Sequence, residues 1–259
     1  MSGPYAAMRS AAEEWEAKHA KLLVETEGLR REVTEQRAIC AAAKAIVGED
    51  RWPRIVRNCG GGARPGSQHG DGAVVLELLG GQETGTYVDV GACHPTECST
   101  TWNLYTRGWS GLLVEPLPQH WYPLLRDRPR DRLCPLAVLD RKGWAMLRVA
   151  GTVSSVRPDW DIAALAEIAV ETDTLAAVVR AYLPGRQVDF LSIDAEGSEA
   201  MVLAGTDWSW LRPEVILIEY RSYHADRPGE DESAAWEPAV LAQGYRLHWQ
   251  DDLNRIYVR

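Results

Sequence analysis

Short apolar runs alternate with amphipathic segments from residue 73 to the end of the sequence. These runs have the length of buried strands, and each ends near an acid, a Gly or a Pro. They read TYVDVG, WSGLLVEP, RLCPLAVLD, GWAMLRVAG, VDFLSIDAEG and EVILIEY. Nearly continuous apolar strands that alternate with helices predict a mostly parallel sheet with helices on both faces. The last segment, YRLHWQDDLNRIYVR, predicts an antiparallel hairpin that turns at residues 252–254.

Capping residues set the bounds of the predicted helices. Ser99 precedes a helical stretch that Gly108 stops, and either Asp173 or Thr174 caps a later helix. Pro123 is expected to interrupt another helical region early, because proline lacks the amide hydrogen that a helix needs. The helices therefore occupy the connections between the predicted strands.

The N-terminal region has a different pattern. Residues 5–47 are rich in Ala, Glu, Lys, Arg and Gln, and Trp15, Leu22 and Leu29 lie seven positions apart. This spacing predicts a long amphipathic helix, or two helices broken near Gly28. Its apolar stripe is buried either in a coiled-coil homodimer or against the larger domain of the same chain. The pattern leaves both arrangements open, and the homodimer is an expectation that experiment can test.

Gly, Pro and Arg punctuate residues 48–72, which predicts a linker after the helical region. We therefore divide the chain into an N-terminal helical extension with its linker, residues 1–60, and a larger domain, residues 61–259. The larger domain has the length of one sizeable α/β unit.

Composition restricts the partners of the chain. The net charge of −9 disfavours binding to nucleic acid or to an anionic membrane surface. No apolar run reaches the roughly 18 residues of a membrane span, and the first residues lack the apolar core of a signal peptide. The five cysteines follow no regular spacing, so we expect reduced thiols in a cytoplasmic protein without a zinc site.

Acidic residues stand where the predicted parallel strands end. Asp89 ends the first strand and Glu115 the second. Asp194 and Glu196 follow the fourth strand, and Glu219 ends the fifth. Open parallel sheets bind their ligands outside the carboxyl ends of the strands. The sequence therefore predicts a negatively charged binding site at this edge of the sheet.

The distance between Gly91 and Glu115 indicates a nucleoside ligand. Glu115 follows Gly91 by 24 residues, and an acid at this place accepts hydrogen bonds from the two ribose hydroxyls. The Gly-x-Gly-x-x-Gly pattern of dinucleotide sites is missing, and Glu97 would repel a pyrophosphate at the start of the next helix. S-adenosylmethionine carries a ribose and no phosphate, and its positive charges suit Asp89. We therefore expect this cofactor, with a nicotinamide-dependent oxidoreductase as the alternative.

Several longer segments carry a family resemblance. They are residues 67–71, YVDVGACHP, STTWNLYTRGWSGLLVEP, DTLAAVV, VDFLSIDAEGSEAMVLAG, PEVILIEY and LAQGYRLHWQDDLNRIYV. Over residues 67–258 the chain resembles the FkbM-type methyltransferase family. The Asp-x-Glu-Gly block at residues 194–197 is the most specific part of the resemblance, and residues 1–60 lie outside it.

The resemblance implies a class I methyltransferase fold. This is a Rossmann-like, seven-stranded sheet, mostly parallel, with a C-terminal antiparallel hairpin and here an N-terminal helical extension. It also implies S-adenosylmethionine as cofactor and methyl transfer to a hydroxyl of a small polar acceptor, such as a sugar or another natural-product intermediate. The predicted cofactor-binding residues are Asp89 and Gly91 in the cofactor turn, Glu115 at the ribose, Ala137 and Val138 beside the adenine, and Ala92, Ser99, Pro116 and Asp194 around them.

Methyl transfer to an alcohol requires alignment of the acceptor with the methyl group and a base that takes the hydroxyl proton. Asp194, Glu196 and His224 are the catalytic candidates. Two neighbouring carboxylates raise the pKa of one another, and the ordinary pKa of histidine already suits the task. Metal-free catalysis is favoured, and a magnesium ion held by Asp194, Glu196 and Glu219 is the alternative.

A non-catalytic scaffold is the third functional hypothesis. In that case the Ala-rich and charged N-terminal helix would be the working surface. The acids at the strand ends favour the enzyme, because a scaffold has no use for them at a ligand-binding edge.

Overall fold

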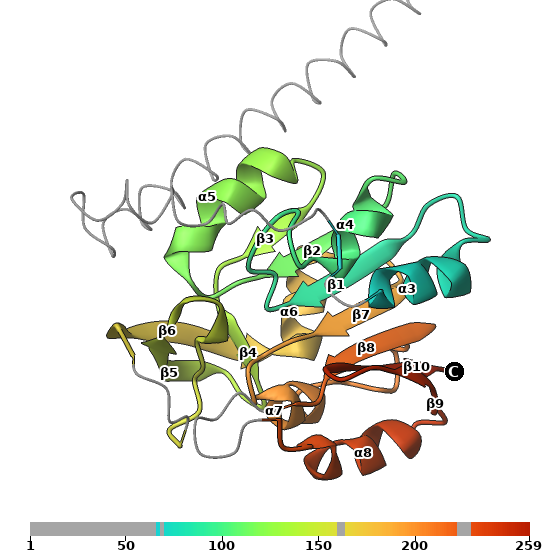
Figure 1. Ribbon diagram of the computed structural model, residues 1–259. Helices are drawn as coiled ribbons and strands as arrows, with labels where there is room; N and C mark the ends of the chain where they lie inside the picture. Colours follow the sequence, from blue (N-terminus) through green and yellow to red (C-terminus); the bar gives the residue numbers. More distant parts are fainter. Residues whose placement is uncertain (1–65, 68–69, 160–163, 222–228) are drawn as a thin grey trace, which may run out of the picture.

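The computed structural model of the chain describes residues 66–67, 70–159, 164–221 and 229–259. These residues form an α/β fold around a seven-stranded sheet with the order β3-β2-β1-β7-β8-β10-β9 (Figure 1). The strands are β1 Thr86–Val90, β2 Ser110–Val114, β3 Arg132–Cys134, β7 Phe190–Ile193, β8 Val215–Glu219, β9 Arg246–Gln250 and β10 Asn254–Val258. The first five in this sheet run parallel, and β10 is antiparallel to both of its neighbours. The predicted fold class is confirmed.

Helices cover both faces of this sheet, as nearly continuous apolar strands require. One face packs against α3 Asp71–Leu79, α4 Thr100–Tyr105 and α5 Pro118–Asp127. The other face packs against α6 Leu175–Tyr182, α7 Glu199–Ala204 and α8 Glu237–Leu241. Alternate residues of one strand serve the two layers: Tyr87 of β1 joins the first core, whereas Val88 and Val90 join the second.

A second, three-stranded sheet corrects the sequence analysis at two places. It has the order β4-β6-β5 and consists of β4 Ala137–Leu139, β5 Gly143–Val149 and β6 Ala166–Thr174. The segment RLCPLAVLD was predicted as one strand, but β3 and β4 divide it between the two sheets around Pro135. Proline cannot donate to a ladder, so the chain leaves the large sheet there. The strand β6 was not predicted at all.

The small sheet lies beyond the carboxyl ends of β1 and β7, which the arrowheads mark in Figure 1. It has its own small core, in which Leu147 and Val170 pack against Ala137 and Leu117. Leu117 follows β2, so this core fastens the small sheet to the carboxyl end of the large one. The sheet thereby forms a wall opposite the strand ends.

Most of the predicted caps are correct. The Ser99 hydroxyl accepts from the Trp102 amide at 3.3 Å, and Thr174 rather than Asp173 caps α6. The prediction for Pro123 was wrong, because α5 runs through it. Burial of apolar residues on both sides of the proline holds this helix to the core and outweighs the loss of one hydrogen bond.

Several predictions concern residues outside those that the structure describes. They are the N-terminal helix, the homodimer it would form and the domain boundary between residues 60 and 61. They also include the thiols of Cys40 and Cys59 and the catalytic candidate His224. Among the described cysteines, Cys93, Cys98 and Cys134 are thiols, as expected. Within the described ranges, every helix is too short or too polar to cross a membrane.

Candidate functional site

A cavity of about 980 Å³ opens between the carboxyl end of the large sheet and the small sheet. Its size is that of a site for a cofactor-sized ligand. Every predicted site residue that the structure describes lines it: Asp89, Gly91, Ala92, Ser99, Glu115, Pro116, Ala137, Val138, Asp194 and Glu196. His94 and His120 line it as well. Residues 107 positions apart in the chain, Asp89 and Glu196, thus meet at one edge, as the parallel topology predicts.

The turn after β1 leaves the backbone bare. Gly91 has φ +84°, in the left-handed region that favours glycine. A Cβ at this position would lie 1.8 Å from the carbonyl oxygen of Asp194. The Gly91 amide donates to the Val114 carbonyl at 3.0 Å, which ties the turn to the end of β2. The absence of a side chain therefore lets the turns after β1 and β7 pack directly against each other.

Asp89 is buried at the end of β1. Thr101 in α4 donates its hydroxyl to the Asp89 carboxylate. Burial raises the pKa of Asp89 to about 6, and the Thr101 hydrogen bond and the Arg128 guanidinium limit the rise. Asp89 is thus poised to ionise near neutral pH and to attract a cationic ligand group.

Glu115 is held at the end of β2 by two backbone amides. The Cys93 amide donates to one carboxylate oxygen at 2.8 Å, and the Leu117 amide donates to the other at 2.7 Å. Burial raises the pKa of Glu115 to about 7 in spite of these bonds. A carboxylate oxygen has two acceptor sites, so each oxygen can still accept from one hydroxyl of a vicinal diol.

The turn after β7 is organised by an acid that the sequence analysis did not consider. The Glu199 carboxylate is buried and accepts from the amides of Ala195 and Gly197, at 2.9 and 3.2 Å. Burial raises the pKa of Glu199 to about 7. Glu196, in the middle of this turn, has φ +50°. This is a strained conformation for a residue with a side chain, and such strain is concentrated at functional sites.

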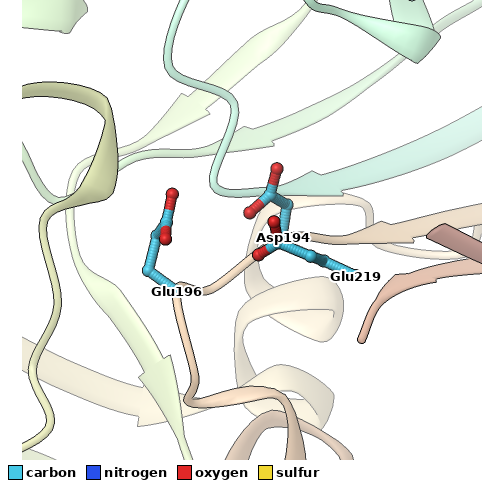
Figure 2. A group of neighbouring side chains, drawn as sticks. All are labelled: Asp194, Glu196 and Glu219. Carbon is cyan, nitrogen blue, oxygen red and sulfur yellow. The ribbon is translucent and has the colours of Figure 1, made fainter. Parts of the chain in front are cut away.

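Asp194, Glu196 and Glu219 form one cluster of carboxylates, which we call the acid triad (Figure 2). One ligand oxygen from each lies within 4.8 Å of the others. Burial raises the pKa of all three, and the charge of Asp194 adds to the rise at Glu196 and Glu219. The triad can therefore share protons, take a proton from a substrate, or bind a cation.

The small sheet supplies a part of the cavity that the sequence analysis missed. Val149, Val156, Leu165 and Ile168 give this wall an apolar surface. The available signal for its strand β6 was the two-residue period at 167–173, in which acids share one face and Ile168 and Val170 the other. Thr101 was also missed, since a hydroxyl inside a helix carries no periodic signal.

Stability is expected to fall as the pH rises from about 5.5 to about 8. Folding raises the pKa of Asp89 to about 6 and those of Glu115 and Glu199 to about 7, from ordinary values of 3.8 and 4.5. Between these values the folded chain holds protons that the unfolded chain has released, so the free energy of unfolding decreases with pH. A pKa difference of about 2 corresponds to about 3 kcal/mol for one group over the whole interval between its unfolded and folded pKa values, and the part above pH 5.5 is lost in this range. Thermal unfolding at about pH 5.5 and about pH 8 measures the effect.

Two variants identify the source of this pH dependence. Glu115→Gln cannot ionise, so its unfolding midpoint should change less with pH than that of the wild type. Glu83 is exposed and lies outside the cavity, so Glu83→Gln should keep the dependence of the wild type. A midpoint that rises with pH would contradict the burial of these carboxylates as the dominant cause.

Comparison with solved structures finds several methyltransferases. A FkbM methyltransferase from Methylobacillus flagellatus is 14% identical, with a TM-score of 0.43 over 68% of this chain and 44% of that one. Fibrillarin from Aeropyrum pernix, solved with S-adenosylmethionine bound, is 15% identical, with a TM-score of 0.40 over 76% and 83%. A provisionally assigned O-methyltransferase from Klebsiella pneumoniae is 9% identical, with a TM-score of 0.42 over 86% and 98%. The chain spans less than half the length of the Methylobacillus protein.

Comparison of sequences identifies the family. No curated protein matches the chain. The Methyltransferase FkbM domain matches residues 89–247, which run from the acid at the end of β1 into β9. This match includes Glu115 and the acid triad, and it confirms the resemblance found in the sequence. Since it spans more than half of the chain, the protein belongs to the FkbM methyltransferase family.

Proposed function

We propose that this protein transfers a methyl group from S-adenosylmethionine to a hydroxyl of a small acceptor, a sugar or another natural-product intermediate. The observation that carries the proposal is the convergence of Asp89, Gly91 and Glu115 in one cavity that is large enough for the cofactor and a second molecule. The same cavity contains the acid triad, which supplies candidate bases for the hydroxyl proton.

The cofactor suits the charge and shape of the large-sheet side of the cavity. Glu115 would accept from the ribose hydroxyls, and the turn at Gly91, which lines the cavity, would face the amino-acid part of the cofactor. Asp89 and the acid triad would attract its ammonium and sulfonium groups. Ala137 and Val138 on β4 would flank the adenine, because they line the cavity beyond the end of β2.

The acceptor would lie between the cofactor and the small sheet. The wall formed by Val149, Val156, Leu165 and Ile168 favours a natural-product intermediate with an apolar face over a bare sugar. Its hydroxyl would approach the acid triad, where Asp194 or Glu196 would take the proton in line with methyl transfer. His224 stays a third candidate base, and it lies outside the described residues.

The other hypotheses are weaker. A nicotinamide dinucleotide would bring its pyrophosphate against a cavity that is lined with carboxylates, and the family of the chain is a methyltransferase family. The scaffold hypothesis concerns the N-terminal helix, which the structure does not describe.

Isothermal titration with S-adenosylhomocysteine, the demethylated cofactor, tests the proposal. The wild type is expected to bind one molecule per chain. Glu115→Ala is expected to bind about tenfold to a hundredfold more weakly for each ribose hydrogen bond lost, since a hydrogen bond to a charged group contributes about 1.5–3 kcal/mol.

Glu83→Ala is the matched control, because it removes an exposed acid outside the cavity. It should bind like the wild type. Failure of the wild type to bind would refute the proposed cofactor. Equal binding by wild type and Glu115→Ala would place the ribose elsewhere.

A further inference from the structure

The acid triad differs in its hydrogen bonding from the buried carboxylates in and near the cavity. Glu115 and Glu199 each accept from two backbone amides, and Asp71 accepts from the Asn254 side chain at 2.9 Å. In the folded chain, these carboxylates are therefore paired with hydrogen-bond donors from the chain itself. Among the described residues, the acid triad has no comparable set of donors.

Two oxygens of the triad are buried and have no hydrogen-bond partner in the part of the chain that the structure describes. They are Oδ1 of Asp194 and Oε2 of Glu196, and each exposes less than 1 Å². A buried carboxylate oxygen without a partner destabilises the fold, and native structures pair such atoms. The residues that carry these oxygens line the cavity, and Figure 2 shows the carboxyl groups of Asp194 and Glu219 close together, with that of Glu196 across a gap from them. These two unpaired oxygens therefore indicate a bound ligand that accepts electron pairs.

The charge of the triad is also uncompensated within the part of the chain that the structure describes. There, the ion pairs of arginine involve other acids, such as Asp131 with Arg128 and Glu232 with Arg157. Asp71 and Glu199 add further negative charge around the triad. A cation would relieve this repulsion, and a divalent ion would relieve it most.

We propose that Asp194, Glu196 and Glu219 bind a divalent cation of the magnesium or manganese type. The donors are all carboxylate oxygens, which hard cations prefer over thiol or imidazole. Oxygens on opposite sides of such an ion lie about 4.2 Å apart for magnesium and about 5 Å apart for calcium. The oxygens of the triad lie within 4.8 Å of one another, so small side-chain rotations would bring all three residues onto one ion. This reverses the preference for a metal-free site that the sequence favoured.

The position of the triad indicates a catalytic role for the cation. Asp194 adjoins the cofactor turn, since its carbonyl oxygen faces the bare Cα of Gly91. A cation here would bind the acceptor hydroxyl oxygen and make its proton more acidic. This role rests on the proposed function, whereas the binding of the ion does not.

Manganese titration of the full chain tests the site. Chelator-treated protein near pH 8 is titrated with MnCl₂, and free Mn²⁺ is followed by its electron paramagnetic resonance signal. We expect one Mn²⁺ per chain, competed by MgCl₂. Glu196→Gln and Glu219→Gln each remove one charged ligand with little change of shape, and we expect them to bind Mn²⁺ at least about tenfold more weakly. Glu83→Gln should bind like the wild type.

The outcomes separate this proposal from the proposed function. Absence of Mn²⁺ binding by a wild type that binds S-adenosylhomocysteine would overturn the cation site and leave the methyltransferase intact. Mn²⁺ binding without S-adenosylhomocysteine binding would support the site and refute the cofactor. Mn²⁺ affinity unchanged in both variants would also overturn the site, since the ion would then lie elsewhere. If either variant fails to fold, as judged by circular dichroism, titrations of the wild type and of Asp194→Asn test the cation site instead.

Discussion

Arg128→Ala is expected to lower the free energy of unfolding by about 3–5 kcal/mol, because it leaves the buried carboxylate of Asp131 without its counter-charge. The Arg128 side chain is fully buried and donates to Asp131 at 2.8 Å, to the Pro95 carbonyl at 2.8 Å and to the Tyr87 hydroxyl at 2.8 Å. Its guanidinium also lies 4.6 Å from the ring centre of Tyr105. Urea titration of both proteins measures the difference.

Arg126→Ala is the control, since it removes an arginine of the same region from the surface. Arg126 pairs with Asp127 at 2.6 Å, but 56% of its side chain is exposed. Exposed pairs of this kind contribute about 0–1 kcal/mol. Equal losses in the two variants would show that the buried network contributes no more than a surface pair.

The same network reaches the candidate site. Arg128 donates to the Thr101 hydroxyl at 3.1 Å, and Thr101 donates to Asp89. Arg128 also holds the Pro95 carbonyl in the loop that follows the cofactor turn. We therefore expect Arg128→Ala to weaken binding of S-adenosylhomocysteine even at temperatures where the variant stays folded. Arg128→Lys should not restore stability, because an ammonium group cannot reproduce the planar fork of donors.

The strand ends could be predicted from the sequence because they follow from pattern alone. Continuous apolar runs between helices imply a parallel sheet, and a parallel sheet brings its carboxyl ends together. Asp89, Glu115 and Asp194 therefore meet in space although they are far apart in the chain. The division of one apolar run between β3 and β4 could not be read in the same way. Both halves are apolar, and only the tertiary arrangement assigns them to different sheets.

The electrostatic partners were harder to predict for a different reason. Arg128 and Asp131 stand in a polar segment that looks like an exposed loop, yet the structure buries both. Glu199 looks like an ordinary acid in the first turn of a helix, yet it holds the preceding turn by two amides. Burial of a charged side chain depends on partners that are supplied from other elements, and a single sequence does not display these pairings.

Gly91→Ala is expected to reduce the affinity for S-adenosylhomocysteine by at least about a hundredfold, or about 2.7 kcal/mol. A left-handed backbone costs an alanine about 1–2 kcal/mol. The added Cβ would also lie 1.8 Å from the Asp194 carbonyl oxygen and 2.9 Å from its carbon, so the turns after β1 and β7 must move apart. Calorimetry with the folded variant measures the affinity.

Because Asp194 is a ligand in the proposed cation site, the movement that relieves this clash should weaken Mn²⁺ binding in the same variant. Gly81→Ala is the control, since a Cβ there meets nothing within 4 Å and the backbone is not left-handed. It should keep both affinities. If Gly91→Ala bound S-adenosylhomocysteine like the wild type, the cofactor could not lie over this turn. If it lost the cofactor and kept Mn²⁺, the two turns would move independently, and the cation would depend on Glu196 and Glu219 rather than on Asp194.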